Sequence, residues 1–152
     1  MAKTSAGLLM YRRTPRGLEV LLAHPGGPGW SKKDEGAWTL PKGEIGEGEE
    51  PIDAARREFY EETGFTAEGP FLELAPVRQK SGKLVRAWAF EGDCKPEKAR
   101  SNFFMMEWPP HSGKNAEFPE IDRVEFFDLP TARMKANPAQ IALIDELERR
   151  LV

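Results

Sequence analysis

The feature that most restricts the fold is a short helical segment with a clear first and last residue, in a chain patterned mostly as strands. Pro51 suits the first position of a helix, because its fixed φ fits there and its missing N–H is not needed. Gly64 suits the position just after a last helical turn. Four residues between them fall within a narrow arc of the helical wheel and predict a buried stripe: Ile52, Ala55, Phe59 and Thr63. We therefore predict an amphipathic helix over 51–63 that packs on a sheet.

Most of the remaining chain is patterned as strands separated by turns rich in Gly and Pro. The predicted strands are 4–13, 18–24, 71–77, 84–91, 102–108 and 123–127, with a hairpin turn at 80–83. A second helix is predicted to begin with Asn137 as N-cap and Pro138 at its first position. Two helices that cover a strand-rich sheet define an α+β layered domain, and a chain of 152 residues is expected to form one such domain over 1–152.

Composition narrows the function classes. The net charge of −3 gives no reason to expect a duplex nucleic-acid partner, because such binding needs a concentrated basic face. No stretch approaches the ~18 consecutive apolar residues of a membrane span, so no membrane partner is expected. The single cysteine, Cys94, favours a reducing, cytoplasmic setting. His24 and His111 lack metal-ligand spacing and are expected on the surface or in loops.

Acidic residues are concentrated in and before the predicted helix. Glu58 and Glu61 are three residues apart, and Glu58 and Glu62 four, so all three carboxylates share one helix face. Like charges at these spacings destabilise a helix by roughly 0.2–0.5 kcal/mol per pair. A solvated face is the ordinary explanation of such a run. The same three carboxylates would also supply the oxygen ligands that Mg²⁺ prefers, and spacing alone is compatible with both explanations.

A longer pattern contains these glutamates. Gly43 is followed after five residues by Glu49, and after seven more by the segment 57–65, Arg-Glu-Phe-Tyr-Glu-Glu-Thr-Gly-Phe. This pattern resembles the complete signature of the Nudix hydrolases. Phe59 and Phe65 stand where that family more often has an aliphatic residue, and both remain apolar. The order of strands and helices along the chain also fits the family.

The resemblance implies a Nudix fold, in which a mixed β-sheet is sandwiched between helices as α/β/α layers. It implies hydrolysis of a diphosphate bond in a small nucleotide-type substrate, with Mg²⁺ or Mn²⁺ as cofactor. The stretch 38–48 looks like that of dinucleoside polyphosphate hydrolases, while a nucleoside triphosphate pyrophosphohydrolase is an equal alternative. A catalytically silent domain that senses a nucleotide is the third. Many relatives pair, so the resemblance leaves a homodimer open.

The resemblance also implies roles for individual residues. Three glutamates are expected to be metal ligands and catalytic residues: Glu58, Glu61 and Glu62. The Lys42 carbonyl is expected to complete the metal shell, and the Lys42 side chain to contact the diphosphate. Family members often use one further glutamate from outside the signature. Glu120 is our candidate for that catalytic role, with Glu117 as the alternative.

Other signature positions are expected to be structural. Arg57 should pair with Glu49 or orient Glu58. Gly43 should let the loop pass close to the metal, where a side chain would intrude. Gly64 should end the helix.

Two substrate contacts are predicted outside the signature. Trp38 is a candidate for stacking on a base, as are Trp30 and Trp108, although core packing is the commoner role of a tryptophan in a small domain. Four cations around the predicted hairpin turn are candidates for contacting substrate phosphates: Arg78, Lys80, Lys83 and Arg86. A solvated hairpin is the equal alternative.

Overall fold

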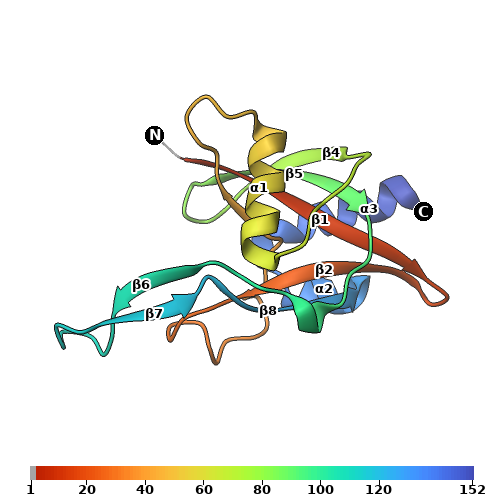
Figure 1. The fold of residues 1–152 in the computed structure, drawn as a ribbon. Helices are drawn as coiled ribbons and strands as arrows, with labels where there is room; N and C mark the ends of the chain where they lie inside the picture. Colours follow the sequence, from red (N-terminus) through yellow and green to blue (C-terminus); the bar gives the residue numbers. More distant parts are fainter. Residues whose placement is uncertain (1–2) are drawn as a thin grey trace.

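The computed structural model describes residues 3–152 and is built around a six-stranded mixed sheet (Figure 1). Its strands are β1 (Thr4–Thr14), β2 (Gly17–Pro25), β3 (Lys42–Glu44), β4 (Leu72–Arg78), β5 (Leu84–Glu91) and β8 (Ile121–Asp128). The order is β4-β5-β1-β2-β8, and β3 pairs with β1 beside the start of that strand. β1 and β5 run parallel, and the other pairs of this sheet run antiparallel.

Helices cover both faces of this sheet. Helix α1 (Pro51–Thr63) crosses one face, and α2 (Leu129–Lys135) and α3 (Ile141–Leu151) cover the other (Figure 1). The expected α+β class, with a mixed sheet between helices, is confirmed. Among the described residues, no helix is long and apolar enough to cross a membrane.

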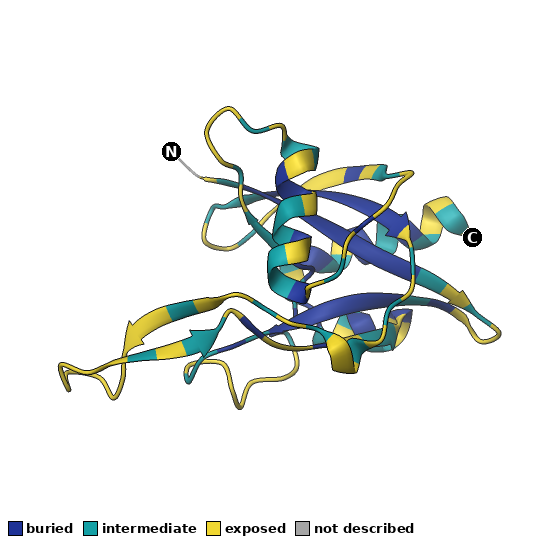
Figure 2. Cartoon of the chain, viewed as in Figure 1, coloured by how far each residue is buried: buried dark blue, intermediate teal, exposed yellow. Residues whose placement is uncertain are grey.

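Alternating residues of β1 build two cores. Ala6, Leu8 and Met10 pack with α1 on one face, while Leu9 and Tyr11 pack with α3 on the other. These residues are all buried, and so are most residues of the neighbouring strands β2 and β5 (Figure 2). A strand that is apolar on both faces must lie at the centre of a sheet covered on both sides, and this explains the position of β1.

Helix α1 begins and ends where the sequence predicts. Pro51 lies in its first turn, and Gly64 follows it with a φ of 80° while donating its N–H to the Tyr60 carbonyl. Phe59 and Ala55 are fully buried against the sheet. The stripe therefore fixes which face of α1 is turned outward, and this orients the glutamates.

Two strands, one α-helix and the short 3₁₀ helix Pro96–Lys98 were not predicted. Strand β3 has only three residues and is held by its pairing with β1. Strand β7 (Asn115–Pro119) pairs with β6 (Phe103–Glu107) in a region that the sequence analysis treated partly as loop. Helix α2 begins after Asp128, whose carboxylate accepts a hydrogen bond from the Thr131 N–H at 2.8 Å.

The predicted start of the last helix is a 3₁₀ turn. Asn137 accepts a hydrogen bond from the Ala139 N–H at 3.0 Å, and the turn Pro138–Gln140 leads directly into α3. The capping residue was therefore predicted at the right position, and the α-helix proper begins slightly later.

The prediction for His24 was wrong. Its ring is 0% exposed, lies edge-on to Trp38, and reaches two oxygen atoms. Its Nδ1 lies 2.9 Å from an Asp122 carboxylate oxygen, and its Nε2 lies 2.5 Å from the Lys33 carbonyl. His24 thus ties the loop after β2 to β8. His111 does lie exposed in a loop, as expected.

Candidate active site

A polar pocket of about 380 Å³ lies between the C-terminal half of α1, β3, and the start of the β6–β7 hairpin. It is lined by Ser5, Lys42, Gly43, Glu44, Glu58, Glu61, Glu62, Lys83, Asn102 and Glu120. Backbone hydrogen bonds hold the hairpin against the helix: Asn102 donates to the Glu61 carbonyl, and Glu120 donates to the Asn102 carbonyl, both at 2.8 Å. The chain thereby brings Glu120 to the helix glutamates from a segment nearly 60 residues away.

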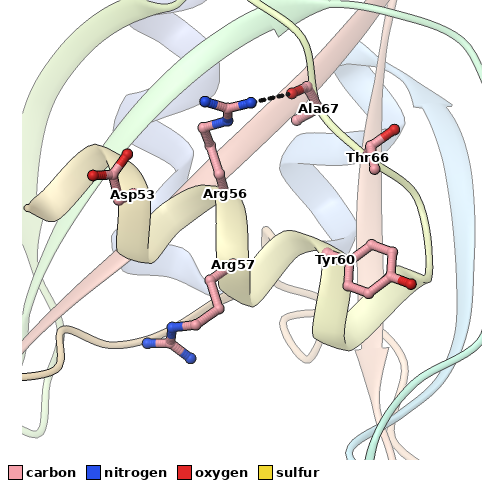
Figure 3. Close-up of a pocket in the computed structure, with 6 residues that line it drawn as sticks. All are labelled: Asp53, Arg56, Arg57, Tyr60, Thr66 and Ala67. Carbon is pink, nitrogen blue, oxygen red and sulfur yellow. Dashed lines mark hydrogen bonds between the residues drawn. The ribbon is translucent and has the colours of Figure 1, made fainter. Parts of the chain in front are cut away.

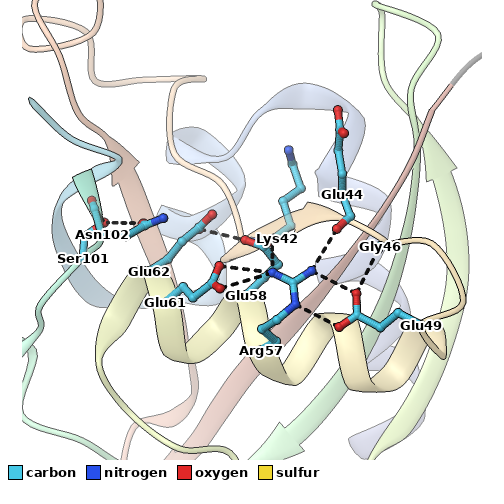
Figure 4. Close-up of polar contacts among 10 residues, drawn as sticks. All are labelled: Lys42, Glu44, Gly46, Glu49, Arg57, Glu58, Glu61, Glu62, Ser101 and Asn102. Carbon is cyan, nitrogen blue, oxygen red and sulfur yellow. Dashed lines mark hydrogen bonds and ion pairs between the residues drawn. The ribbon is translucent and has the colours of Figure 1, made fainter. Parts of the chain in front are cut away.

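Arg57 organises the acidic face of α1 (Figure 4). Its guanidinium donates to both carboxylate oxygens of Glu49, at 2.9 and 3.0 Å. Its third nitrogen donates to Glu58 at 2.9 Å and to Glu61 at 3.2 Å. A further bond of 3.2 Å reaches the Glu44 carbonyl. One positive charge therefore offsets part of the repulsion among these carboxylates and fixes two of them in place.

Gly43 leaves the space that Glu58 occupies. A Cβ atom at this position would lie 2.0 Å from the Glu58 carboxyl carbon, so no other residue fits without moving that side chain. Close contact between β3 and α1 is therefore a direct consequence of this glycine.

Burial changes the proton affinities of the pocket. It raises the pKa of the Glu62 carboxyl to about 8, and the neighbouring charge of Glu58 adds to this rise. Burial also raises the pKa of Glu58, against the opposing effect of Arg57. Burial lowers the pKa of Lys42, and the positive charge of Lys83 lowers it further. The carboxyl groups of Glu58 and Glu62 and the ammonium group of Lys42 are thus poorly solvated in this pocket.

The glutamates share the pocket without converging on one point. Within residues 3–152, no group of three or more His, Cys, Asp or Glu side chains lies close enough together to hold a metal ion. In this structure Glu58 and Glu61 bind Arg57, and Glu62 accepts the Lys42 N–H at 3.3 Å. The expected role of the three glutamates as metal ligands stays a prediction.

Two predicted substrate contacts lie elsewhere. Trp38 is 1% exposed, packs edge-on against Phe127 at 4.9 Å, and donates its indole N–H to Asp34 at 2.8 Å. A ring without an accessible face cannot stack on a base, so this prediction was wrong. Arg78 does not line the pocket either, because its guanidinium turns back to the Gly82 carbonyl at 2.8 Å. Lys83, from the same hairpin, does line it.

The other two tryptophans depart from the core role that we favoured for them. Trp30 and Trp108 are 44% and 40% exposed. Trp30 lies under the Lys33 ammonium, 4.8 Å from the ring centre, and Trp108 lies just after β6. Neither residue lines the glutamate pocket.

A second hollow of about 300 Å³ lies on another side of α1, lined by Asp53, Arg56, Arg57, Tyr60, Thr66 and Ala67 (Figure 3). Arg56 and Arg57 point in opposite directions from the helix there. Arg56 donates to the Ala67 carbonyl at 3.4 Å. This hollow contains one carboxylate among its lining residues, so it lacks the donor set of the glutamate pocket.

Sequence reasoning missed three lining residues, Ser5, Glu44 and Asn102. Ser5 reaches the pocket because β1 pairs with both β3 and β5, and Asn102 because the hairpin packs on the end of α1. Both positions depend on long-range pairing, and neither residue carries a local signal. Lys83 was detectable as a cation beside a hairpin turn.

Fold and pocket together define the class of protein. A mixed sheet between helices, with a glutamate-lined pocket at the outward face of the helix that follows β3, is the arrangement of a Nudix domain. The family model described as "NUDIX domain" matches residues 1–147, and the chain belongs to this family.

Known proteins resemble this chain in sequence and in fold. An RNA pyrophosphohydrolase of Bartonella henselae is 33% identical over 109 residues, which cover 62% of this chain and 60% of that protein. The matched region thus spans about 60% of the length of that relative. An Ap4A hydrolase of C. elegans superposes with a TM-score of 0.69 at 22% identity, covering 97% of each chain. The NUDIX domain of Shewanella oneidensis NrtR, solved with ADP ribose, superposes with a TM-score of 0.70 at 15% sequence identity. The match covers 100% of this chain and 90% of that one.

Proposed function

We propose that this chain hydrolyses a diphosphate bond in a nucleotide-type substrate. The observation that carries the proposal is the pocket that combines Glu58, Glu61, Glu62 and Glu120 with Lys42 and Lys83. A diphosphate needs cations to offset its charge, and its hydrolysis needs a carboxylate to accept a proton from water. Lys42 and Lys83 are proposed to contact phosphate oxygens. Glu61, Glu62 or Glu120 is proposed to accept the proton.

The donor set fits a hard divalent cation such as Mg²⁺ or Mn²⁺, because every candidate ligand is an oxygen. Glu58, Glu61 and Glu62, with the Lys42 carbonyl, would hold it. When bound, such a cation supplies charge neutralisation and lowers the pKa of a water molecule. Arg57 would keep Glu58 in position, since it already holds that carboxylate together with Glu49.

Two substrate classes are supported by the relatives. One is named an RNA pyrophosphohydrolase and one structural neighbour an Ap4A hydrolase, so a 5′-polyphosphate and a dinucleoside polyphosphate are the first substrates to compare. Both contain the same linkage of phosphates to a nucleoside. The pocket described above accounts for recognition of that shared linkage and not for the choice between the two.

The test is a substrate panel read by product separation. The purified protein is incubated with Mg²⁺ and nucleoside triphosphates, 5′-triphosphorylated RNA, dinucleoside polyphosphates, nucleotide sugars and ADP-ribose. Glu61→Gln is assayed alongside, because it keeps the side-chain shape and removes the charge. Turnover of one class that is lost in the variant and on chelation supports the proposal. Metal-dependent nucleotide binding without any turnover would support a silent, nucleotide-sensing domain instead.

We also propose that the chain forms a homodimer through the β6–β7 hairpin. This hairpin projects from the body of the molecule and is largely exposed (Figure 2), and several of its exposed residues are large and apolar. Those chiefly exposed are Phe103, Met105, Met106 and Trp108. Among the described residues β6 pairs only with β7, so its outer edge is open. A two-stranded hairpin is marginally stable alone, and a second copy would cover this surface.

The proposed working unit is one domain over residues 1–152 in the cytoplasm. Cys94, the one cysteine, is a free and partly buried thiol. Burial raises its pKa to about 11, which keeps the thiol protonated at neutral pH. A chain with such a thiol needs no oxidising compartment to fold.

A further inference from the structure

The Ser5 hydroxyl is buried without a hydrogen-bond partner. Ser5 is 0% exposed, and its Oγ is the one buried side-chain atom within residues 3–152 that finds neither donor nor acceptor. A buried hydroxyl without a partner destabilises a fold, so alanine would fill this position at lower free energy. The apolar packing that Leu9 and Tyr11 provide on the same face of β1 does not explain a serine here.

Ser5 is also part of the pocket wall. It lies opposite Glu44 of β3 and opposite Val85 of β5, between two strands that each bring a lysine to the pocket. Lys42 begins β3, and Lys83 immediately precedes β5. Both lysines line the same pocket as Ser5. Three hydrogen-bond donors thus share one side of the pocket.

We propose that Ser5, Lys42 and Lys83 form an anion subsite that binds the non-bridging oxygens of a phosphate group, with the Ser5 hydroxyl as a donor. Phosphate oxygens only accept hydrogen bonds, so one phosphate satisfies the hydroxyl and both ammonium groups together. The proposal rests on the proposed function, because it assigns the diphosphate of that substrate to this side of the pocket. The glutamates of α1 and Glu120 line the rest.

Binding of inorganic pyrophosphate, measured by calorimetry with and without Mg²⁺, tests the subsite without any turnover. Ser5→Ala is expected to weaken pyrophosphate binding by about 10- to 100-fold, the effect of one lost hydrogen bond to a charged group. Lys83→Ala is expected to weaken it by about 10-fold or more. Lys80→Ala is the matched control, since it removes the same charge from the exposed turn of the same hairpin and does not line the pocket. Thr4→Ala is the control on β1. Both controls should bind within about twofold of the unsubstituted protein.

Thermal unfolding of the unliganded protein supplies a second readout. Ser5→Ala should unfold at an equal or higher temperature than the unsubstituted protein, because it removes a buried hydroxyl that has no partner. If Ser5→Ala binds pyrophosphate more weakly but is no less stable, the hydroxyl acts in binding and not in folding. A lower unfolding temperature together with unchanged pyrophosphate affinity would overturn the proposal.

The two proposals fail in different ways. If pyrophosphate binding follows the expected order of variants but no nucleotide is hydrolysed, the subsite stands and the proposed function falls. If substrate is hydrolysed and Ser5→Ala leaves both KM and pyrophosphate affinity unchanged, the subsite falls and the proposed function stands.

Discussion

Arg57 explains how a helix tolerates its own row of glutamates. Glu58 and Glu61 would repel each other on a bare helix, but both accept hydrogen bonds from the same guanidinium, which Glu49 holds in place. The geometry is bidentate toward Glu49, and lysine cannot reproduce it. The Arg57 guanidinium therefore offsets the charge repulsion that the spacing of these glutamates implies.

Gly43→Ala tests the close contact at the residue scale. The new Cβ would lie 2.0 Å from the Glu58 carboxyl carbon, so we expect Glu58 to move, with turnover falling by about 100-fold, the scale of a 1 Å misplacement. The strain should also cost about 1–3 kcal/mol of unfolding free energy. Steady-state kinetics and denaturant unfolding measure the two effects. Gly29→Ala, where no atom lies within 4 Å of the added Cβ, should change neither.

Glu49→Gln tests the ion pair through pH. Hydrogen bonds from Arg57 hold the pKa of the Glu49 carboxyl at about 2, below its ordinary value of 4.5. A lowered pKa means that the stabilisation is present above pH 4.5 and is lost as the pH falls through about 2. We therefore expect the unfolding temperature of the variant to lie below that of the unsubstituted protein at pH 7, and the two to approach each other toward pH 2. An equal difference at every pH would contradict an ionic role for Glu49.

Residue-scale prediction succeeded where the signal is local. Gly43, Arg57 and the glutamates of α1 stand at fixed spacings, and all of them take part in one network or pocket. Ser5 gives no such signal, because its place depends on the parallel pairing of β1 with β5. Trp38 shows the opposite error, since its aromatic ring suggested stacking on a base, whereas the ring is buried in the core.

At the scale of elements, α1 was predictable because both of its ends carry their own signals. Proline at the start and glycine after the end set the helix limits without help from the rest of the chain. Strand β3 and strand β7 lacked such signals. The first is only three residues long, and each is stabilised by hydrogen bonds to a partner strand that the sequence does not name.

Gly64→Ala measures how much the C-terminal end of α1 contributes to the free energy of unfolding. Gly64 has a φ of 80°, and an added Cβ would lie 3.2 Å from the Arg100 carbonyl oxygen. We expect a loss of about 1 kcal/mol for the left-handed backbone, and more if the Arg100 segment cannot yield. Gly48→Ala is the matched control, because its φ of 73° is similar and no atom lies within 4 Å. If chemical denaturation gives equal losses for both variants, the contact with Arg100 contributes nothing.

At the scale of the whole molecule, the β6–β7 hairpin exposes apolar side chains that no other part of the described chain covers. Met105 is 61% exposed and Phe103 59%, and both lie in strand β6 of the hairpin. We expect Phe103→Ser with Met105→Ser to convert a dimer to a monomer in light scattering, because it removes the apolar surface that a second copy would cover. Met134→Ser, at an equally exposed apolar residue of α2, should leave the mass unchanged. A monomeric unsubstituted protein would contradict the dimer directly.

The central claim is that this pocket directs water onto a phosphorus atom, and hydrolysis in ¹⁸O-labelled water tests it most directly. With the substrate that the panel identifies, mass spectrometry is expected to find one ¹⁸O atom in one of the two phosphate-containing products, and none in the nucleoside oxygen. The label should be absent from reactions with Glu61→Gln or with a chelator. Products formed without incorporated ¹⁸O on phosphorus would contradict the account.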